Sequence, residues 1–299
     1  MLTASSFGRA LWLSLLTAGL VMPMNLSSAA DLQGIPRPQS VKDTDIIGGR
    51  KINSWESSPW QVALISSASV NHVQGVFCGG TLIDSQWVLT AAHCLFDPTN
   101  CAEILPQAFY VGYGSIDLGK KITLLAPQEM HVRPGYTCGK KGNDLALIRL
   151  PESVVVSSYI QLPSAAEASS FTTTGYRLMT TGWGLTEVNG WKSRDLIEVE
   201  VPVVQYDSCK AHYGADLSAN AICAGETGKD ACTWDSGGPL YKRVTGNRAV
   251  QLGIVSYGDS CGKAKAPGVY EPTAAHLAWI EEVRKPKPCT QKDIDEKRC

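Results

Sequence analysis

The stretch that decides the fold of this chain reads Asp230-Ala231-Cys232-Thr233-Trp234-Asp235-Ser236-Gly237-Gly238-Pro239. An acid precedes Ser236, and two adjacent glycines follow it. Adjacent glycines suit the interior of a helix or strand poorly, because they lose much backbone entropy on folding. They are typical of a tight turn, or of backbone that another group approaches closely. The stretch therefore predicts a loop that presents the Ser236 hydroxyl to a substrate, with backbone N–H groups directed at the same place.

A serine hydroxyl is a weak nucleophile, so it needs a neighbouring base and a group that orients the base. The candidate base is His93, which follows Thr90-Ala91-Ala92, and the candidate orienting acid is Asp144, which precedes Leu145-Ala146-Leu147. In acyl transfer the serine attacks, the histidine takes its proton, and the aspartate fixes the tautomer of the histidine. The chain order His, Asp, Ser is one of several in which this geometry recurs. We therefore predict His93, Asp144 and Ser236 as catalytic residues.

Seven short motifs occur in a fixed order along the chain. They are Ile46-Ile47-Gly48-Gly49, Cys78-Gly79-Gly80, Ala91-Ala92-His93-Cys94, Asp144-Leu145-Ala146-Leu147, Gly182-Trp183-Gly184, Asp235-Ser236-Gly237-Gly238-Pro239 and Gly268-Val269-Tyr270. Each is weakly specific by itself, but the ordered set, which covers the chain from Ile46 to about Val283, resembles the trypsin/chymotrypsin family of serine endopeptidases. The resemblance implies an all-β fold of two six-stranded antiparallel β-barrels, with the site in the cleft between them and a C-terminal helix.

Composition and residue pattern agree with an all-β fold. The chain has 299 residues and a formal net charge of −1, which gives no reason to expect nucleic acid or an anionic membrane as a partner. Trp60–Leu64, Trp87–Thr90 and Ile197–Val201 alternate or cluster their apolar residues as strands do, and glycine, asparagine and proline separate such runs. The amphipathic segment 273–284 predicts the C-terminal helix.

The N-terminal residues indicate export and processing. Residues 1–30 are typical of a secretory signal peptide, because Arg9 precedes an apolar run, Leu11–Val21, that is too short to span a bilayer. An N-terminal membrane anchor is the alternative. Residues 31–45 are polar and resemble a short propeptide. We therefore expect a secreted, extracellular and monomeric protein that is made as a zymogen.

The remaining boundaries follow from the resemblance. It implies a protease domain at 46–284, with barrels at about 46–157 and 158–272. Residues 285–299 form a charged C-terminal extension, which we interpret as a solvated tail closed by a disulfide. An export or partner-docking signal is the alternative interpretation of this extension.

The ten cysteines predict disulfides. None lies in a Cys-x-x-Cys pair, which argues against zinc and thioredoxin-type chemistry, and an even number in an exported chain indicates disulfides. We predict no metal site and no cofactor. The family resemblance implies the pairs Cys78–Cys94, Cys209–Cys223 and Cys232–Cys261. By elimination we suggest Cys101–Cys138, which joins two loops near the catalytic His and Asp, and Cys289–Cys299.

The resemblance also implies a mode of activation. Cleavage before Ile46 frees an α-amino group, which in this family inserts beside the acid that precedes the nucleophile, here Asp235. The chain departs from the family at Asp45, where an arginine or lysine is usual. We therefore expect a separate activating protease and no simple self-activation.

Substrate choice in this family is set at the base of a pocket. The resemblance places Asp230 there, where an acid pairs with a substrate arginine or lysine side chain. Gly258 and Gly268 match the pocket walls, and Ser256 and Gly258 match main-chain hydrogen-bond partners of an extended peptide. Tyr257 stands where the family usually has tryptophan. These substrate-binding residues predict cleavage of protein or peptide substrates after arginine or lysine.

Trp234 is the clearest departure from the family. The family has glycine at this position, and its N–H forms the oxyanion hole together with the N–H of the serine, here Ser236. A tryptophan keeps the N–H, but it must adopt a positive φ that favours glycine. Three outcomes stay open: an active endopeptidase, an oxyanion hole that forms only when a partner or substrate reorganises the loop, or a binding protein without activity. We favour the active enzyme, since His93, Asp144, Ser236 and Asp230 are all intact. A structural or adhesive protein has only the C-terminal extension in its favour.

Overall fold

The computed structural model describes residues 48–187, 190–245, 248–263 and 265–286, all of which belong to one structural unit. The expected signal peptide and propeptide, Ile46 and the suggested Cys289–Cys299 pair lie outside these residues. Within them, no helix is both long enough and apolar enough to cross a membrane.

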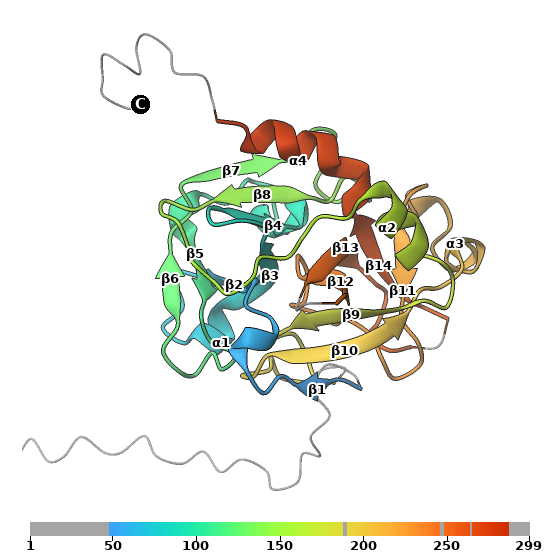
Figure 1. Ribbon diagram of the computed structural model, residues 1–299, viewed down its shortest axis with the longest axis horizontal. Coiled ribbons are helices and arrows are strands. Elements are labelled where there is room, and N and C mark those ends of the chain that lie inside the picture. Colours follow the sequence, from blue (N-terminus) through green and yellow to red (C-terminus); the bar gives the residue numbers. More distant parts are fainter. Residues whose placement is uncertain (1–47, 188–189, 246–247, 264, 287–299) are drawn as a thin grey trace, which may run out of the picture. The chain divides into compact units, whose positions relative to one another are not determined.

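Two antiparallel sheets of seven strands each form the body of the fold (Figure 1). The first consists, in spatial order, of β6 (Thr123–Leu125), β5 (Phe109–Tyr113), β2 (Gln61–Ser66), β3 (Val76–Leu82), β4 (Trp87–Thr90), β8 (Ala146–Arg149) and β7 (Glu129–Val132). The second consists of β1 (Arg50–Lys51), β10 (Ile197–Pro202), β9 (Arg177–Gly182), β12 (Pro239–Arg243), β13 (Ala249–Tyr257), β14 (Gly268–Pro272) and β11 (Ile222–Ala224).

This arrangement confirms the all-β class and the double-barrel architecture. The resemblance implied six strands in each barrel, whereas each sheet has seven, because short edge strands such as β1 and β6 extend the ladders. Strand β1 pairs with β10, with Arg50 opposite Glu198, so the first described residues belong to the second sheet. The expected division at about 157/158 therefore does not separate the two sheets completely.

The strands expected from the sequence are present, and they bury their apolar residues. Strand β2 runs from Gln61 to Ser66. It begins one residue later than the expected Trp60–Leu64 and ends two residues later. Strand β4 has the expected bounds, and β10 extends the expected strand by one residue, to Pro202. One apolar cluster comes mostly from the first sheet but also includes Tyr241, Ala249 and Ile254 of the second, and another cluster lies within the second sheet. Burial stabilises such clusters by about 25 cal/mol per Å² of apolar surface.

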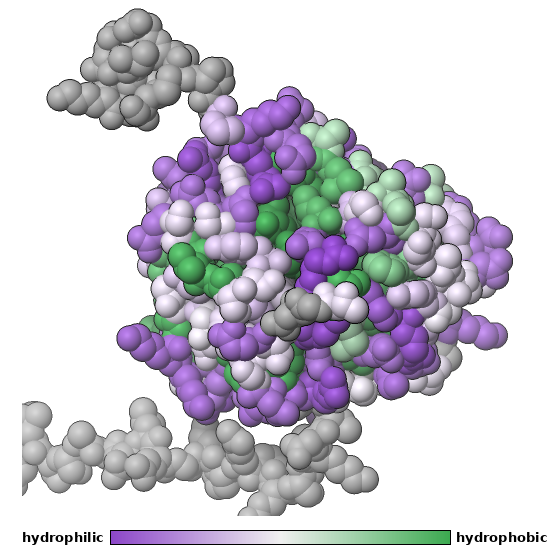
Figure 2. Space-filling view, in the orientation of Figure 1, coloured by the Kyte–Doolittle hydropathy of each residue, from purple (hydrophilic) through white to green (hydrophobic). Residues whose placement is uncertain are grey.

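Helices lie at the margins of the sheets. They are α1 (His72–Gly75), α2 (Ala165–Phe171), α3 (Tyr206–Tyr213) and α4 (Leu277–Arg284). The expected helix at 273–284 starts later, because Thr273–His276 forms a 3-10 turn. The backbone of His276 has φ −122°, outside the helical range, while its imidazole contacts Glu271 at 2.7 Å. On the face shown in Figure 2, hydrophobic residues gather in patches among hydrophilic ones, as is usual for a protein surface.

Buried polar contacts join the two sheets. The Thr181 hydroxyl donates to Gln61 Oε1 at 2.7 Å, and the Thr81 hydroxyl donates to Gln251 Oε1 at the same distance. A buried hydroxyl or amide is costly without a partner, so these pairs fix how the two sheets face each other. The chain segments that carry the expected site residues meet along this junction.

Candidate active site

The pairing of β4 with β8 brings His93 and Asp144 together. Thr90, at the end of β4, lies opposite Ala146, at the start of β8. His93 follows β4 in a 3-10 turn, Ala92–Leu95, and Asp144 comes two residues before β8. The His93 backbone N–H donates to Asp144 Oδ1, and His93 Nδ1 lies 2.8 Å from Oδ2. With its proton on Nδ1, the imidazole keeps a lone pair on Nε2, which lies 3.8 Å from the disulfide sulfur of Cys94.

The carboxylate of Asp144 is buried but stays ionised. Burial by itself raises its pKa, whereas the charge of His93 and hydrogen bonds from His93 and Ser256 lower it, and the net effect is a pKa below the ordinary value. The Ser256 hydroxyl donates to Oδ2, so the side chain of Ser256 supports Asp144. The sequence indicated only a main-chain role for Ser256, and no motif signals this side-chain contact.

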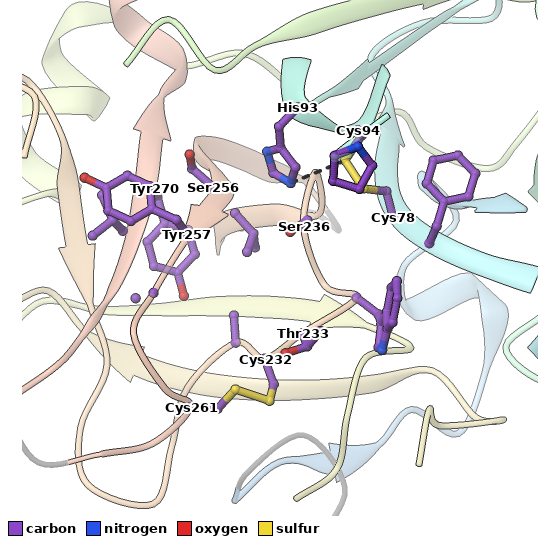
Figure 3. A pocket seen from close by; sticks show the side chains of 18 of the residues that line it. Cys78, His93, Cys94, Cys232, Thr233, Ser236, Ser256, Tyr257, Cys261 and Tyr270 are labelled. Carbon is purple, nitrogen blue, oxygen red and sulfur yellow. Dashed lines mark hydrogen bonds between the residues drawn. A yellow bond between two sulfur atoms is a disulfide. The ribbon is translucent and has the colours of Figure 1, made fainter. Parts of the chain in front are cut away.

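The loop that carries Ser236 is held between the two sheets by its backbone. The Ser236 carbonyl accepts a hydrogen bond from the Gly79 N–H at 2.7 Å, and the Gly237 N–H donates to the Val255 carbonyl at 2.9 Å. Ser236 and His93 line one cleft of about 680 Å³. Figure 3 shows the His93 imidazole above Ser236, beside the Cys78–Cys94 disulfide. The loop therefore presents the Ser236 hydroxyl to the cleft that the imidazole also faces.

Asp235, next to Ser236, points away from the cleft into the protein. Its Oδ1 accepts the Gly184 N–H at 2.8 Å, and its Oδ2 accepts the Cys232 N–H at 2.9 Å. A Cβ on Gly184 would lie 2.6 Å from this carboxyl, so only glycine leaves room for it. Burial raises the pKa of Asp235 to about 7, against the effect of these two N–H groups. Within the described ranges no cation pairs with it, and Ile46 lies outside them.

Asp230 lines the same cleft with 3% of its surface exposed. Its Oδ2 accepts the Gly262 N–H at 3.2 Å, whereas its Oδ1 has no hydrogen-bond partner of good geometry among the described residues. Burial raises the pKa of Asp230 to about 7. A Cβ on Gly268 would lie 2.8 Å from Oδ1 and would fill the space in front of it. A buried acid that lines a cavity and keeps an oxygen without a well-placed hydrogen-bond donor suits a cationic ligand group.

The other two residues expected to bind substrate also line the cleft. Tyr257 and Gly258 follow Ser256 at the end of β13. The Tyr257 hydroxyl donates to the Asp216 carbonyl at 3.0 Å, and its ring packs edge-on against Tyr213 at 5.6 Å. The aromatic wall of the cleft is therefore fixed by contacts outside it.

Trp234 adopts the left-handed backbone conformation, with φ +79°. The Asp235 N–H donates to the Cys232 carbonyl at 3.0 Å, which closes a β-turn with Trp234 as its third residue. Thr233 is not among the residues with positive φ, so the turn is of type II. Such a conformation costs a non-glycine residue about 1–3 kcal/mol. In the described structure, the N–H groups of Trp234 and Ser236 donate to no other residue, so neither has a protein acceptor.

The Trp234 side chain has a cationic neighbour that the sequence did not indicate. Lys192 Nζ lies 4.0 Å from the centroid of the indole, a contact worth about 0.5–2 kcal/mol depending on its exposure. Lys192 is 42 positions away along the chain and belongs to none of the seven motifs. The contact between Lys192 and Trp234 could have been predicted only from information that places these two positions close together in space.

All eight cysteines in the described ranges form disulfides. The pairs are Cys78–Cys94, Cys101–Cys138, Cys209–Cys223 and Cys232–Cys261, as suggested from the sequence. Cys78 and Cys94 approach His93, but their sulfurs are bonded to each other and therefore offer no thiolate to a metal.

The family model for trypsin matches residues 46–280. Transmembrane protease serine 11G of Rattus norvegicus is 35% identical over 234 residues, which cover 77% of this chain and 52% of that protein. Trypsin II-P29 of Gallus gallus is 34% identical over 249 residues, which cover 82% and 91% of the two chains. Mannan-binding lectin serine protease 1 of Rattus norvegicus is 32% identical over 280 residues, or 88% of this chain and 38% of that protein. The chain thus spans about half the length of the transmembrane protease it matches.

Proposed function

This chain belongs to the trypsin family of serine proteases, and on that premise we propose that it is a secreted endopeptidase that hydrolyses peptide bonds after arginine or lysine. The observation that carries the proposal is the His93–Asp144 pair, in which both oxygens of a buried carboxylate bind one histidine. Ser236 lines the same cleft as that histidine. A nucleophile, a base and an orienting acid are the parts that acyl transfer requires.

The proposed reaction forms and breaks an acyl-enzyme. The Ser236 oxygen attacks the peptide carbonyl carbon while His93 Nε2 takes the hydroxyl proton, and Asp144 stabilises the resulting imidazolium. The N–H groups of Trp234 and Ser236 bind the oxygen that becomes negative. When the C–N bond breaks, the imidazolium returns the proton to the leaving amine. Water then attacks the ester and gives a proton to His93, and the Ser236 oxygen leaves with that proton.

The preference for arginine or lysine is proposed from Asp230. Its Oδ1 lacks a well-placed hydrogen-bond donor in a nearly fully buried position, which is unfavourable for a carboxylate, and a guanidinium or ammonium group would supply a partner. The small Gly268 keeps the approach to that oxygen open. A long basic side chain is the substrate group that both features favour.

Synthesis as a zymogen is proposed from Asp235. This buried acid has two N–H partners but no described cation, and the α-amino group freed by cleavage before Ile46 would supply one. Because Asp45 precedes that bond, we propose a separate activating protease. Secretion is proposed from residues 1–30 and from the disulfides, which persist in oxidising compartments.

The test is hydrolysis of an arginine p-nitroanilide by protein whose N-terminus is shown to be Ile46, with Ser236→Ala as the control. Turnover that the control lacks is the expected result. The unfavourable backbone conformation of Trp234 favours a second candidate function. This candidate is a binding protein that has the same fold but no peptidase activity. No turnover despite a free Ile46 would favour this candidate.

A further inference from the structure

The peptide group between Thr233 and Trp234 is held on its carbonyl side by a segment remote in sequence. The Thr233 carbonyl accepts a hydrogen bond from the Leu185 N–H at 2.9 Å. In a trans peptide the C=O and N–H groups point in opposite directions. The Trp234 N–H therefore points away from Leu185. The orientation of this single peptide group decides whether the oxyanion hole has both of its donors.

The turn itself does not favour this orientation. Type I and type II turns differ mainly by a flip of their central peptide, which here is the Thr233–Trp234 peptide. Type I accepts almost any residue at its third position, whereas type II needs a positive φ there and therefore favours glycine. With tryptophan at position 234, local preference opposes the observed turn. A contact outside the turn must offset that preference.

Lys192 supplies such a contact. Its Nζ lies 4.0 Å from the centroid of the Trp234 indole and donates to the carbonyls of Gln74 and Val76. No carboxylate pairs with Lys192 among the described residues. Partial burial lowers the pKa of this ammonium, which agrees with a cation whose partners are carbonyls and a ring. The ammonium is thus fixed in place beside the indole.

Lys192 and Leu185 belong to the same local structure, since the two residues form an antiparallel bridge. One segment therefore contacts this part of the turn twice, through the Leu185 N–H on the Thr233 carbonyl and through the Lys192 ammonium on the Trp234 ring. These two contacts together favour the turn that carries a left-handed tryptophan.

We propose that Lys192 is a positioning residue for the oxyanion hole, because it holds the Trp234 indole and thereby keeps the Trp234 N–H directed at the substrate carbonyl. The inference rests on the proposed peptidase function. Lys192 touches no reacting atom in this proposal and acts only through Trp234.

A double-mutant cycle tests the proposal in protein that starts at Ile46. Lys192→Met should lower kcat on an arginine p-nitroanilide by about 10-fold with KM nearly unchanged, since complete loss of one oxyanion donor costs about 10²–10³. In a Trp234→Gly background the same Lys192→Met change should alter kcat by less than about 2-fold, because glycine adopts the positive φ unaided. Lys192→Arg should keep most of the activity, as it retains the cation.

Two ligands separate positioning from a general structural effect. Benzamidine presents a cation to Asp230 and needs no oxyanion donor, so Lys192→Met should leave its Kd unchanged. A peptidyl argininal adds to Ser236 and places an oxygen in the oxyanion hole, so its Ki should rise by the same factor as kcat falls. Lys242→Met is the matched control, because Lys242 Nζ lies 4.8 Å from the Tyr176 ring and donates to the Arg177 carbonyl away from the cleft.

An equal effect of Lys192→Met in the wild-type and Trp234→Gly backgrounds would overturn the inference, as would a parallel loss of benzamidine affinity. A wild type that is inactive while Trp234→Gly is active would also overturn it, because Lys192 would then not hold the donor in place. Activity absent from both proteins would overturn the proposed function itself, and the inference with it.

Discussion

The carboxylate of Asp144 binds His93 twice, with one oxygen on the backbone N–H and the other on Nδ1, both at 2.8 Å. The two contacts fix the position of the histidine as well as its tautomer. A third contact, from the Ser256 hydroxyl, leaves the carboxylate almost fully surrounded by donors. An acceptor-only group is therefore required at this position.

Asp144→Asn should abolish most of the peptidase activity. An amide can accept only through its oxygen. If its NH₂ group takes the place of Oδ2, it faces both His93 Nδ1 and the Ser256 hydroxyl, and the histidine is driven to the wrong tautomer. We expect kcat on an arginine p-nitroanilide to fall by about 10⁴-fold. Asp117→Asn, which removes an acid paired with Arg194, is the control. Activity within tenfold of wild type would show that Asp144 does not orient the base.

Cation binding at Asp230 should depend on pH near neutrality. The carboxyl has a pKa raised to about 7 in the unliganded protein, and only its ionised form attracts a cation. The affinity for benzamidine should therefore be greatest above pH 7 and fall towards tenfold per pH unit below it. Calorimetry on Ser236→Ala protein measures this directly. Asp230→Asn should weaken binding and remove the inflection, and an inflection that persists in that variant would assign it to another group.

The uncleaved protein should lose stability as the pH rises from about 4 to 7. Asp235 has a pKa raised to about 7, so the folded chain holds a proton there that the unfolded chain has already released. The resulting stabilisation is complete below the unfolded pKa and is lost as the pH rises through 7, by about 4 kcal/mol for three pH units. Asp230 contributes with the same sign.

Urea unfolding of uncleaved Ser236→Ala protein at pH 5 and pH 8 measures this loss. Asp235→Asn should remove about half of the pH dependence, because Asp230 is then the remaining described carboxyl whose pKa is raised to about 7. An unchanged dependence in this variant would mean that Asp235 is already paired in the uncleaved chain. Cleavage before Ile46 should reverse the effect at pH 8, because the new α-amino group would pair with the ionised acid.

The disulfide Cys101–Cys138 should be a major source of stability. It closes a loop with a sequence separation of 37, for which loss of chain entropy in the unfolded state gives about 4 kcal/mol. The double substitution Cys101→Ala and Cys138→Ala should lower the free energy of unfolding by about 2–4 kcal/mol and lower Tm accordingly. Wild-type stability in the double variant would show that neighbouring contacts already fix these loops.

The sequence predicted those features that depend on local pattern or on motif identity. Strand β4 has the expected bounds because Trp87 to Thr90 is buried throughout. The Cys101–Cys138 pair followed from elimination, and the structure confirms it, whereas Cys289–Cys299 stays a prediction. The roles of His93, Asp144, Ser236 and Asp230 also stay predictions, although the chain brings all four to one cleft or to its edge.

The features that the sequence did not predict depend on contacts between remote positions. The Ser256 hydroxyl reaches Asp144 across 112 positions, and neither neighbour of Ser256 indicates such a contact. The start of α4 depends on how His276 meets Glu271, which periodicity cannot reveal. From the sequence alone, Trp234 is only an unfavourable replacement of glycine, because the sequence does not show that Lys192 lies beside its indole.

Each end of the described chain packs against the sheet formed mainly by the other half of the chain. Strand β1 pairs with β10 in the second sheet, and Ile280 of α4 packs into an apolar cluster that comes mostly from the first. Each half of the chain therefore completes the other. We therefore expect the two barrels to unfold together, because a break in the chain near residue 157 would separate β1 from its partner β10 and α4 from much of the cluster it packs into.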